Sequence, residues 1–207
     1  MDDTLQRHWD GRFGSSAPET LSWYQKEAGV SLELLARFAP DPVRGLIDVG
    51  AGNGRLVDAL LARGGRDLSL LDLSETALAQ TRARLGAAAA QVDFLTGDLR
   101  RWEPPRRWAI WHDRAVFHFM VAPEERAAYL AALAQGTGPG ALVLIATFSP
   151  EGPERCSGLP VMRYSAAELA ECLGPEYVLL HGETRDHLTP AGAAQNFTHA
   201  VFRRVGG

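Results

Sequence analysis

The sequence has little of what marks membrane, secreted or nucleic-acid-binding proteins. No apolar stretch approaches the roughly 20 residues of a membrane-spanning helix. The amino terminus is acidic and has no apolar core, so we expect no signal peptide. The chain holds two cysteines in different contexts, which argues against a disulfide framework. A net charge of −4 argues against a nucleic-acid partner. We expect a cytoplasmic protein that contacts neither membrane nor nucleic acid.

The chain also lacks internal repeats and long low-complexity segments. Its 207 residues fit one domain that can bury a core, and 46% hydrophobic and 22% charged residues are ordinary for a globular protein. We expect a segment over residues 1–28 to precede a single domain over 29–207. The sequence gives no indication of the oligomeric state.

The most informative stretch is residues 46–54, Leu-Ile-Asp-Val-Gly-Ala-Gly-Asn-Gly. An apolar run ends in Asp48, and glycines follow at positions 50, 52 and 54. Glycine allows backbone angles closed to other residues and removes the side chain between main chain and ligand. A strand that turns this tightly into a helix forms a floor for a nucleotide-like molecule.

A second acid stands at the corresponding place on a neighbouring strand. The apolar run over residues 68–71 ends in Asp72. An acid at the tip of that strand can bind both hydroxyls of a ribose. The spacing of the glycines excludes a dinucleotide fingerprint, because Gly-x-Gly-x-x-Gly requires glycine where this chain has Arg55.

Strand and helix patterns alternate along the chain up to residue 173. We predict strands near 45–49, 68–72, 92–95, 108–112 and 141–148, and helices near 31–38, 54–63, 74–85, 123–134 and 165–173. Two closing strands are predicted near 177–181 and 197–202. Alternation predicts a parallel sheet with helices on both faces.

The turn and the order of the elements together resemble motif I and the sheet of the class I S-adenosylmethionine (SAM) methyltransferases. The resemblance implies a Rossmann-like α/β fold with a seven-stranded, mostly parallel sheet and a C-terminal antiparallel hairpin. It also implies SAM as the cofactor. The cofactor-binding residues that it implies are Asp48, Gly50, Gly52, Gly54, Asp72, Leu73, Asp98 and Leu99. For Asp48 and Asp98 the alternative is an acid that only caps a helix or a turn.

Aromatic residues before the sheet form a second resemblance. The segments around Trp9, Trp23 and Tyr24 resemble the tryptophan-containing lids of thiopurine, thiol and halide methyltransferases. The resemblance implies a lid over residues 1–28 that covers cofactor and substrate and excludes water. The alternative is that these rings only pack on the edge of the domain.

The methyl acceptor is expected just after the fourth strand, since ligands bind at the carboxyl ends of parallel strands. The pair Asp113-Arg114 resembles a motif of the thiopurine and halide methyltransferases. The stretch that begins at Cys156, and the closing segment that runs from His187 to Phe197, resemble small bacterial methyltransferases of unassigned substrate. We predict His112 and Arg114 as catalytic residues. Predicted substrate contacts are Trp9, Trp23, Tyr24, Asp113, His118 and Cys156.

Structural roles without a part in the chemistry are alternatives for several of these residues. A histidine near a strand end is more often a structural, hydrogen-bonded group. Arg114 is as well suited to a salt bridge with Asp113 or Asp98. Cys156 is described equally by an ordinary loop thiol. The arginine cluster at positions 100, 101, 106 and 107 can touch RNA, but a solvated loop face is commoner.

The sequence therefore predicts a SAM-dependent methyltransferase of a small molecule, acting on a thiol or other soft nucleophile. Methyl transfer to a thiolate or halide needs little base catalysis, whereas an alcohol or ammonium must lose a proton. Alternatives are an amine or carboxylate acceptor, or a non-catalytic SAM-binding subunit. No metal is expected, because the spacings of Cys156, His181, His187 and His199 match no zinc pattern.

Overall fold

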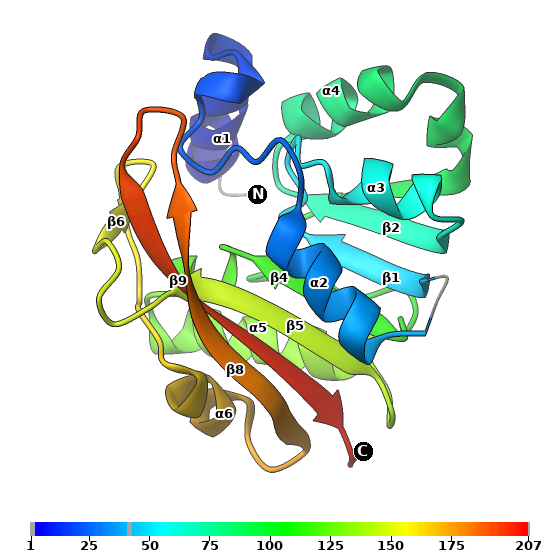
Figure 1. Ribbon diagram of the computed structural model, residues 1–207, viewed down its shortest axis with the longest axis vertical. Helices are drawn as coiled ribbons and strands as arrows, with labels where there is room; N and C mark the ends of the chain where they lie inside the picture. The colour runs from blue at the N-terminus through cyan, green and yellow to red at the C-terminus, as the bar shows by residue number, and fades with distance from the viewer. Residues whose placement is uncertain (1–2, 41–42, 207) are drawn as a thin grey trace.

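Seven strands form one mixed sheet in the order β3-β2-β1-β4-β5-β9-β8 (Figure 1). The computed structural model describes residues 3–40 and 43–206. The parallel strands are β1 (Arg44–Val49), β2 (Arg66–Asp72), β3 (Val92–Thr96), β4 (Ile110–Arg114) and β5 (Leu142–Phe148). Strands β8 (Tyr177–Leu188) and β9 (Ala194–Arg204) form an antiparallel hairpin against β5. The predicted Rossmann-like fold is confirmed.

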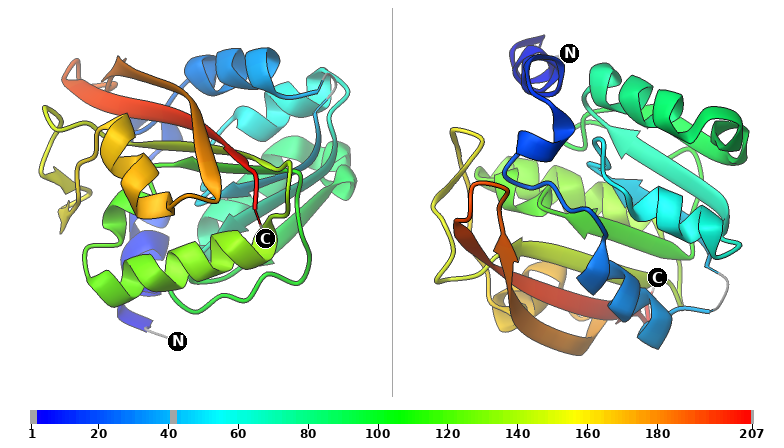
Figure 2. Two further views of the ribbon diagram at one scale, coloured as in Figure 1. Left: turned by 90° about the horizontal axis from the view of Figure 1, so that it is seen from below. Right: turned by 45° about the horizontal axis from the view of Figure 1, so that its top comes forward.

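Helices cover both faces of the sheet, as alternation requires (Figures 1 and 2). One face packs against α2 (Gly29–Phe38), α3 (Leu56–Ala62) and α4 (Glu75–Leu85). The other packs against α5 (Pro123–Gly136) and α6 (Ala166–Leu173). Three short 3-10 turns are η1 (Pro18–Thr20), η2 (Gly86–Gln91) and η3 (Phe117–Phe119). None of the helices in the described ranges is long and apolar enough to cross a bilayer.

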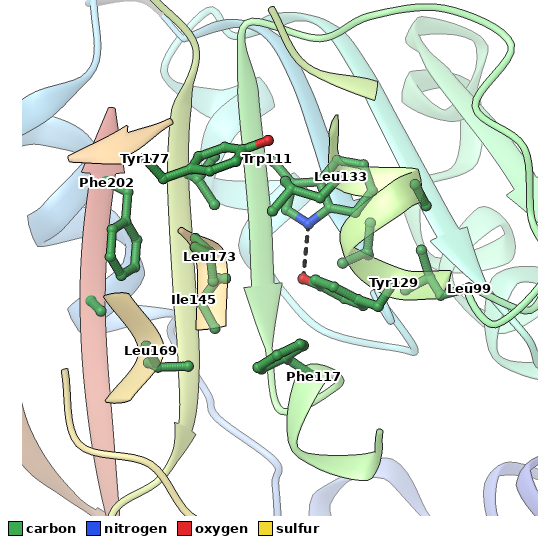
Figure 3. Close-up of a cluster of buried hydrophobic side chains, with 14 of the residues drawn as sticks. Leu99, Trp111, Phe117, Tyr129, Leu133, Ile145, Leu169, Leu173, Tyr177 and Phe202 are labelled. Atoms are coloured by element: carbon green, nitrogen blue, oxygen red, sulfur yellow. Dashed lines mark hydrogen bonds between the residues drawn. The ribbon is translucent and has the colours of Figure 1, made fainter. Parts of the chain in front are cut away.

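The core under α5 contains a polar chain that fixes the end of β4 (Figure 3). The Trp111 indole N–H donates to the Tyr129 hydroxyl at 3.0 Å, and that hydroxyl donates to Asp113 at 2.6 Å. Asp113 also accepts from the backbone amides of Val116 and Phe117. Because all these groups are buried, each needs its partner, and the network holds the segment after β4 in one conformation.

The first helix, α1 (Asp3–Ser15), lies outside the sheet and beside α4 (Figures 1 and 2). Asp10 accepts hydrogen bonds from the Ser74 hydroxyl at 2.6 Å and the Thr76 amide at 3.2 Å. Ser74 is itself the N-cap of α4, where it accepts from the Ala77 amide. The amide of Gln80 donates to the Phe13 carbonyl. A helix N-terminus with two donors therefore anchors the segment that precedes the sheet.

Two parts of the fold differ from the prediction. The closing strands were predicted near 177–181 and 197–202, but β8 and β9 are about twice as long. The added half of β8 lies at the sheet edge and follows a register shift between Leu179 and His181. Its residues are mostly exposed and polar, so no alternation of apolar residues identifies it as a strand. A two-stranded ribbon, β6 (Arg155–Cys156) with β7 (Leu159–Pro160), was not predicted.

Candidate functional site

A cavity of about 380 Å³ opens at the carboxyl ends of β1, β2 and β4. It lies within the size range of small-molecule sites. Helix α1, the segment after η1 and the β6–β7 ribbon supply its other walls. The predicted residues that line it are Trp9, Trp23, Tyr24, Asp48, Gly50, Gly52, Gly54, Asp72, Leu73, Asp98, Leu99, His112, Arg114 and Cys156. Residues from seven separate parts of the sequence thus meet at one place.

The glycine turn after β1 forms the floor of the cavity. Gly50 and Gly52 have φ angles of +64° and +53°, which L-residues with side chains rarely adopt. A Cβ on Gly50 would also overlap the Val116 side chain, and one on Gly52 would lie 3.1 Å from the Phe13 ring. Conformation therefore favours glycine at both positions, and at Gly50 the Val116 side chain also leaves no room for a Cβ.

Asp72 stands beside this turn at the end of β2. Its carboxylate accepts from the backbone amides of Gly52 and Ser74, each at 2.7 Å. Burial raises the pKa of Asp72 to about 6, although both amide donors act in the opposite direction. Each carboxylate oxygen accepts one bond from the main chain and keeps a lone pair for a further donor.

Asp98 is engaged by two arginines, which differs from the free acceptor that the resemblance implies. Arg100 forms a two-pronged bond to it, with distances of 2.9 and 2.8 Å, and Arg101 adds a contact at 3.2 Å. Burial raises the pKa of Asp98, but the Arg100 guanidinium outweighs burial and holds that pKa below its ordinary value. Since Arg106 likewise pairs with Asp67, three arginines of the predicted basic cluster are bound to acids.

Asp48, His112 and Ser31 form a hydrogen-bonded chain across β1, β4 and α2. Asp48 and His112 are register partners on neighbouring strands. The His112 Nδ1 lies 2.6 Å from Asp48 Oδ1, and its Nε2 lies 2.9 Å from the Ser31 hydroxyl. All three side chains are buried at the wall of the cavity. Both ring nitrogens of His112 therefore have hydrogen-bond partners within the chain.

Arg114 contributes a positive charge without an acidic partner. Its Nη1 donates to the Trp23 carbonyl at 3.1 Å, and its guanidinium lies 5.1 Å from the Phe197 ring centre. Its Nη2 is buried and has no hydrogen-bond partner among the described residues. Burial lowers the pKa of Arg114 to about 10, so the group stays charged at neutral pH. Of the described acids, neither Asp113 nor Asp98 forms the salt bridge considered from the sequence.

Two predicted substrate residues do not reach the cavity. Asp113 is fully buried beneath it, where the Tyr129 hydroxyl and two backbone amides occupy its carboxylate. His118 is also fully buried, and its Nδ1 faces the Phe148 amide at 3.4 Å. Burial, aided by the charge of Arg114, lowers the pKa of His118 to about 3, so its ring is neutral. Both residues shape the turn after β4 and do not line the site.

The remaining walls are apolar and aromatic. The Trp9 ring packs edge-on against Trp23 and Phe119, with centroid distances of 6.0 and 5.3 Å. The Cys156 thiol lies in the β6–β7 ribbon, and burial raises its pKa above the ordinary value. Both cysteines are free, and no cluster of metal-ligating side chains occurs within residues 3–40 and 43–206.

Sequence reasoning missed three contributors to this site. Asp10 anchors α1, Ser31 binds His112, and Phe119 closes the aromatic wall. Ser31 lies inside the first turn of α2. No local pattern distinguishes a serine that caps a helix from one whose partner lies 81 positions further along the chain.

The residues present fit SAM. Two buried acids, Asp48 and Asp72, lie on either side of a glycine turn that leaves no side chain in the way. Asp48 Oδ2 has no partner among the described residues, so it is available to an ammonium group. The raised pKa of Asp72 indicates a carboxylate short of donors, which ribose hydroxyls would supply.

Comparisons with known proteins point to a methyltransferase. Residues 46–140 match the family model described as a methyltransferase domain. Over 106 residues the chain is 30% identical to the trans-aconitate 2-methyltransferase of Rhizobium meliloti, a match that covers 51% of this chain and 40% of that protein. The chain thus spans less than half the length of this curated relative.

Solved structures share the fold over nearly the whole chain. A SAM-dependent methyltransferase from Anabaena variabilis superposes with a TM-score of 0.74 at 19% identity, covering 98% of this chain and 94% of its own. The 1,6-didemethyltoxoflavin-N1-methyltransferase of Burkholderia thailandensis, solved with S-adenosylhomocysteine, superposes with a TM-score of 0.70 at 22% identity. That match covers 98% of this chain and 86% of the other.

Proposed function

We propose that this chain, identified by its methyltransferase domain and its fold as a class I SAM-dependent methyltransferase, methylates a small molecule at a thiol or other soft nucleophile. The cofactor supplies a methyl group on a sulfonium. A sufficiently nucleophilic atom bonds to the methyl carbon while the carbon–sulfur bond breaks, and S-adenosylhomocysteine leaves as a neutral thioether. The chain itself has to bind both molecules, align them and exclude water.

The cofactor end of the cavity is assigned to the glycine turn and its two acids. In our proposal Asp48 accepts from the ammonium of the methionine part, and Asp72 accepts from the ribose hydroxyls. Leu73 and Leu99 supply apolar contacts to the adenine. Asp98 takes part only if an adenine amino group competes with Arg100 for its carboxylate, since both its oxygens already accept strong bonds.

The acceptor end is assigned to Arg114, Cys156 and the aromatic wall. One observation carries the choice of nucleophile: His112 is the only histidine among the described residues that line the cavity, and both its ring nitrogens are engaged. An acceptor that must lose a proton would find no histidine base without hydrogen-bond partners there. An acceptor that arrives as an anion needs none, and the unpaired Arg114 offsets its charge.

A carboxylate is the second candidate acceptor. The relative from Rhizobium meliloti is named for trans-aconitate, which makes a carboxylate the acceptor suggested by that likeness. A carboxylate also arrives as an anion and suits Arg114. An amine is supported less by the site, because an ammonium must be deprotonated first.

Residues 1–28 are proposed to act as a lid. Support comes from the positions of Trp9, Phe13 and Trp23 in the cavity wall, and from the anchoring of α1 on α4 through Asp10. Each ring buries apolar surface that faces the place where the two substrates would meet. Water exclusion there would strengthen the nucleophile.

The direct test is methyl transfer from labelled SAM to a panel of matched small acceptors. Thiols, halides, chalcogen anions, carboxylates and amines of similar size should be compared at equal concentration. We expect turnover with thiols or chalcogen anions and a pH–rate profile that follows the pKa of the acceptor. Turnover with carboxylates alone would contradict the soft-nucleophile proposal and support a carboxylate as the acceptor. No methyl transfer to any acceptor, with SAM bound, would favour a non-catalytic SAM-binding subunit.

A further inference from the structure

The chain Ser31–His112–Asp48 points to a role for His112 other than proton removal. Asp48 accepts through Oδ1 at 2.6 Å, so with an ionised carboxylate the proton between them belongs to His112 Nδ1. The Nε2 is then an acceptor, and the Ser31 hydroxyl at 2.9 Å is its donor. Asp48 thereby fixes the tautomer, and the serine restrains the plane of the ring.

The geometry leaves one oxygen of Asp48 for a ligand. His112 binds Oδ1, whereas Oδ2 has no hydrogen-bond partner among the described residues and belongs to a side chain that lines the cavity. A buried carboxylate held from one side only presents its second oxygen in a fixed direction. Such an arrangement pre-organises an acceptor for a cation without a cost of reorientation when the cation binds.

Ser31 has no other evident reason to face the sheet. It lies in the first turn of α2, is 5% exposed, and its hydroxyl contacts no group among the described residues except His112. Register pairing of β1 with β4 sets Asp48 beside His112, and α2 packs across both strands. Three separate elements therefore combine to hold one carboxylate.

We propose that Ser31 and His112 are positioning residues, which orient Asp48 Oδ2 toward the ammonium of the methionine part of SAM. The inference rests on the proposed cofactor role of Asp48. It assigns His112 to cofactor binding instead of the catalytic role predicted from the sequence. It also adds Ser31, which the sequence did not single out for the site.

Two isosteric substitutions separate the two ring nitrogens. The amide nitrogen of Asn reaches about as far as Nδ1, so His112→Asn keeps the hydrogen bond to Asp48 and loses the one to Ser31. The amide of Gln reaches about as far as Nε2, so His112→Gln keeps the hydrogen bond to Ser31 and loses the one to Asp48. We expect His112→Asn to bind S-adenosylhomocysteine within about threefold of wild type, and His112→Gln to bind about ten- to hundredfold more weakly in calorimetry.

Controls separate this effect from general damage to the fold. His199→Asn changes a buried histidine that does not line the cavity, and it should leave affinity unchanged. Ser31→Ala should weaken binding by less than about tenfold, because the ring loses one of its two restraints. Thermal unfolding of each variant shows whether it is folded at the temperature of the titration.

A measurement on the wild-type protein tests the geometry without any variant. Nitrogen NMR of the free protein should show the His112 proton on Nδ1 and a bare Nε2. A proton on Nε2, or equal affinities of the Asn and Gln variants, would overturn the proposal. If the wild-type protein bound no S-adenosylhomocysteine, the proposed function would fail while the Nδ1 tautomer could still be observed.

Discussion

At Asp72 a single carboxylate accepts hydrogen bonds from two backbone amides and keeps a lone pair on each oxygen for a further donor. Because burial raises its pKa to about 6, the group gains a proton just below neutral pH in the free protein. Ribose hydroxyls can donate only to the ionised form with full strength. We therefore predict that the affinity for S-adenosylhomocysteine is constant above pH 6 and falls by up to about tenfold per pH unit below it.

Calorimetry between pH 5 and 8 measures this dependence. Asp72→Asn should bind more weakly and lose the slope, because the amide does not titrate. Asp186→Asn, an exposed change on β8, should keep the wild-type profile. Asp72→Ala should cost on the order of 2–4 kcal/mol of binding. Unchanged affinity in that variant would remove Asp72 from the cofactor site.

Arg114 illustrates a conflict between stability and function at one residue. Burial lowers its pKa and so disfavours its charged form, and no acid of the described residues forms an ion pair with it. We predict that Arg114→Met raises the free energy of unfolding by on the order of 1 kcal/mol and raises the KM of an anionic acceptor at least tenfold. Denaturant titration and steady-state kinetics measure the two effects.

Arg114→Lys serves as the matched variant, since it keeps the charge and loses only the planar donor group. Its KM should lie between those of wild type and Arg114→Met. Arg203→Met, near the carboxyl end of β9, is the control. It should change neither the free energy of unfolding nor the KM by a comparable amount. A fall in stability of Arg114→Met with unchanged KM would mean that the arginine is structural.

Among the elements, α1 lies outside the sheet and packs beside α4. Asp10 and Gln80 link it to α4, and its aromatic residues line the cavity. We predict that residues 3–28 gain protection from hydrogen exchange when S-adenosylhomocysteine binds, because the ligand adds contacts to the inner side of the helix. Mass spectrometry of the exchanged protein gives the protection for each segment.

Asp10→Ala should reduce this added protection, since it removes the acceptor for Ser74 and Thr76. Peptides from α6, which lies on the opposite face of the sheet, report on the fold as a whole and should not change. Equal protection of residues 3–28 with and without ligand would leave α1 as a packing element alone.

In the molecule as a whole, buried acids and buried histidines oppose one another as pH changes. The pKa of Asp72 and that of Asp113 are raised to about 6 by burial, so these groups bind protons in the folded state that the unfolded state has released. The pKa of His118 and that of His199 are lowered to about 3, also by burial, so here the unfolded state binds the additional protons. Between pH 4 and 6 the two pairs cancel.

We predict that the ligand-free protein changes its melting temperature by no more than about 3 °C between pH 4.5 and 6. Below pH 4 Asp72 and Asp113 are protonated in both states. The unfolded state then binds additional protons at His118, at His199 and at Asp98, whose pKa is lowered in the folded state, so stability falls as pH falls. His118→Asn removes one of the two histidines and leaves both acids, so between pH 4 and 6 its stability should decrease as pH rises, by about 1.4 kcal/mol per unit. A flat profile in that variant would contradict the prediction.

Much of the fold follows from local properties of the chain. Apolar periods set the strands and helices, and the φ angles of Gly50 and Gly52 follow from a turn that only glycine permits. These signals lie within a few residues of the structure they determine. The order of strands and helices in turn brings Asp48 and Asp72 to the same edge of the sheet. The polar half of β8 lacks such a signal, and its extent depends on pairing with β9.

The partner of each polar side chain was decided by the tertiary structure. His112 meets Asp48 because β4 pairs with β1 in one register, and it meets Ser31 because α2 packs over both. Asp113, one position further along β4, points to the opposite face and is sealed under α5 by Tyr129. Strand alternation predicts that neighbours diverge, but only the assembled sheet shows which one faces the cavity. Sequence alone therefore determined the fold and the edge of the sheet where the cavity lies, and packing between distant elements determined which side chains face that cavity.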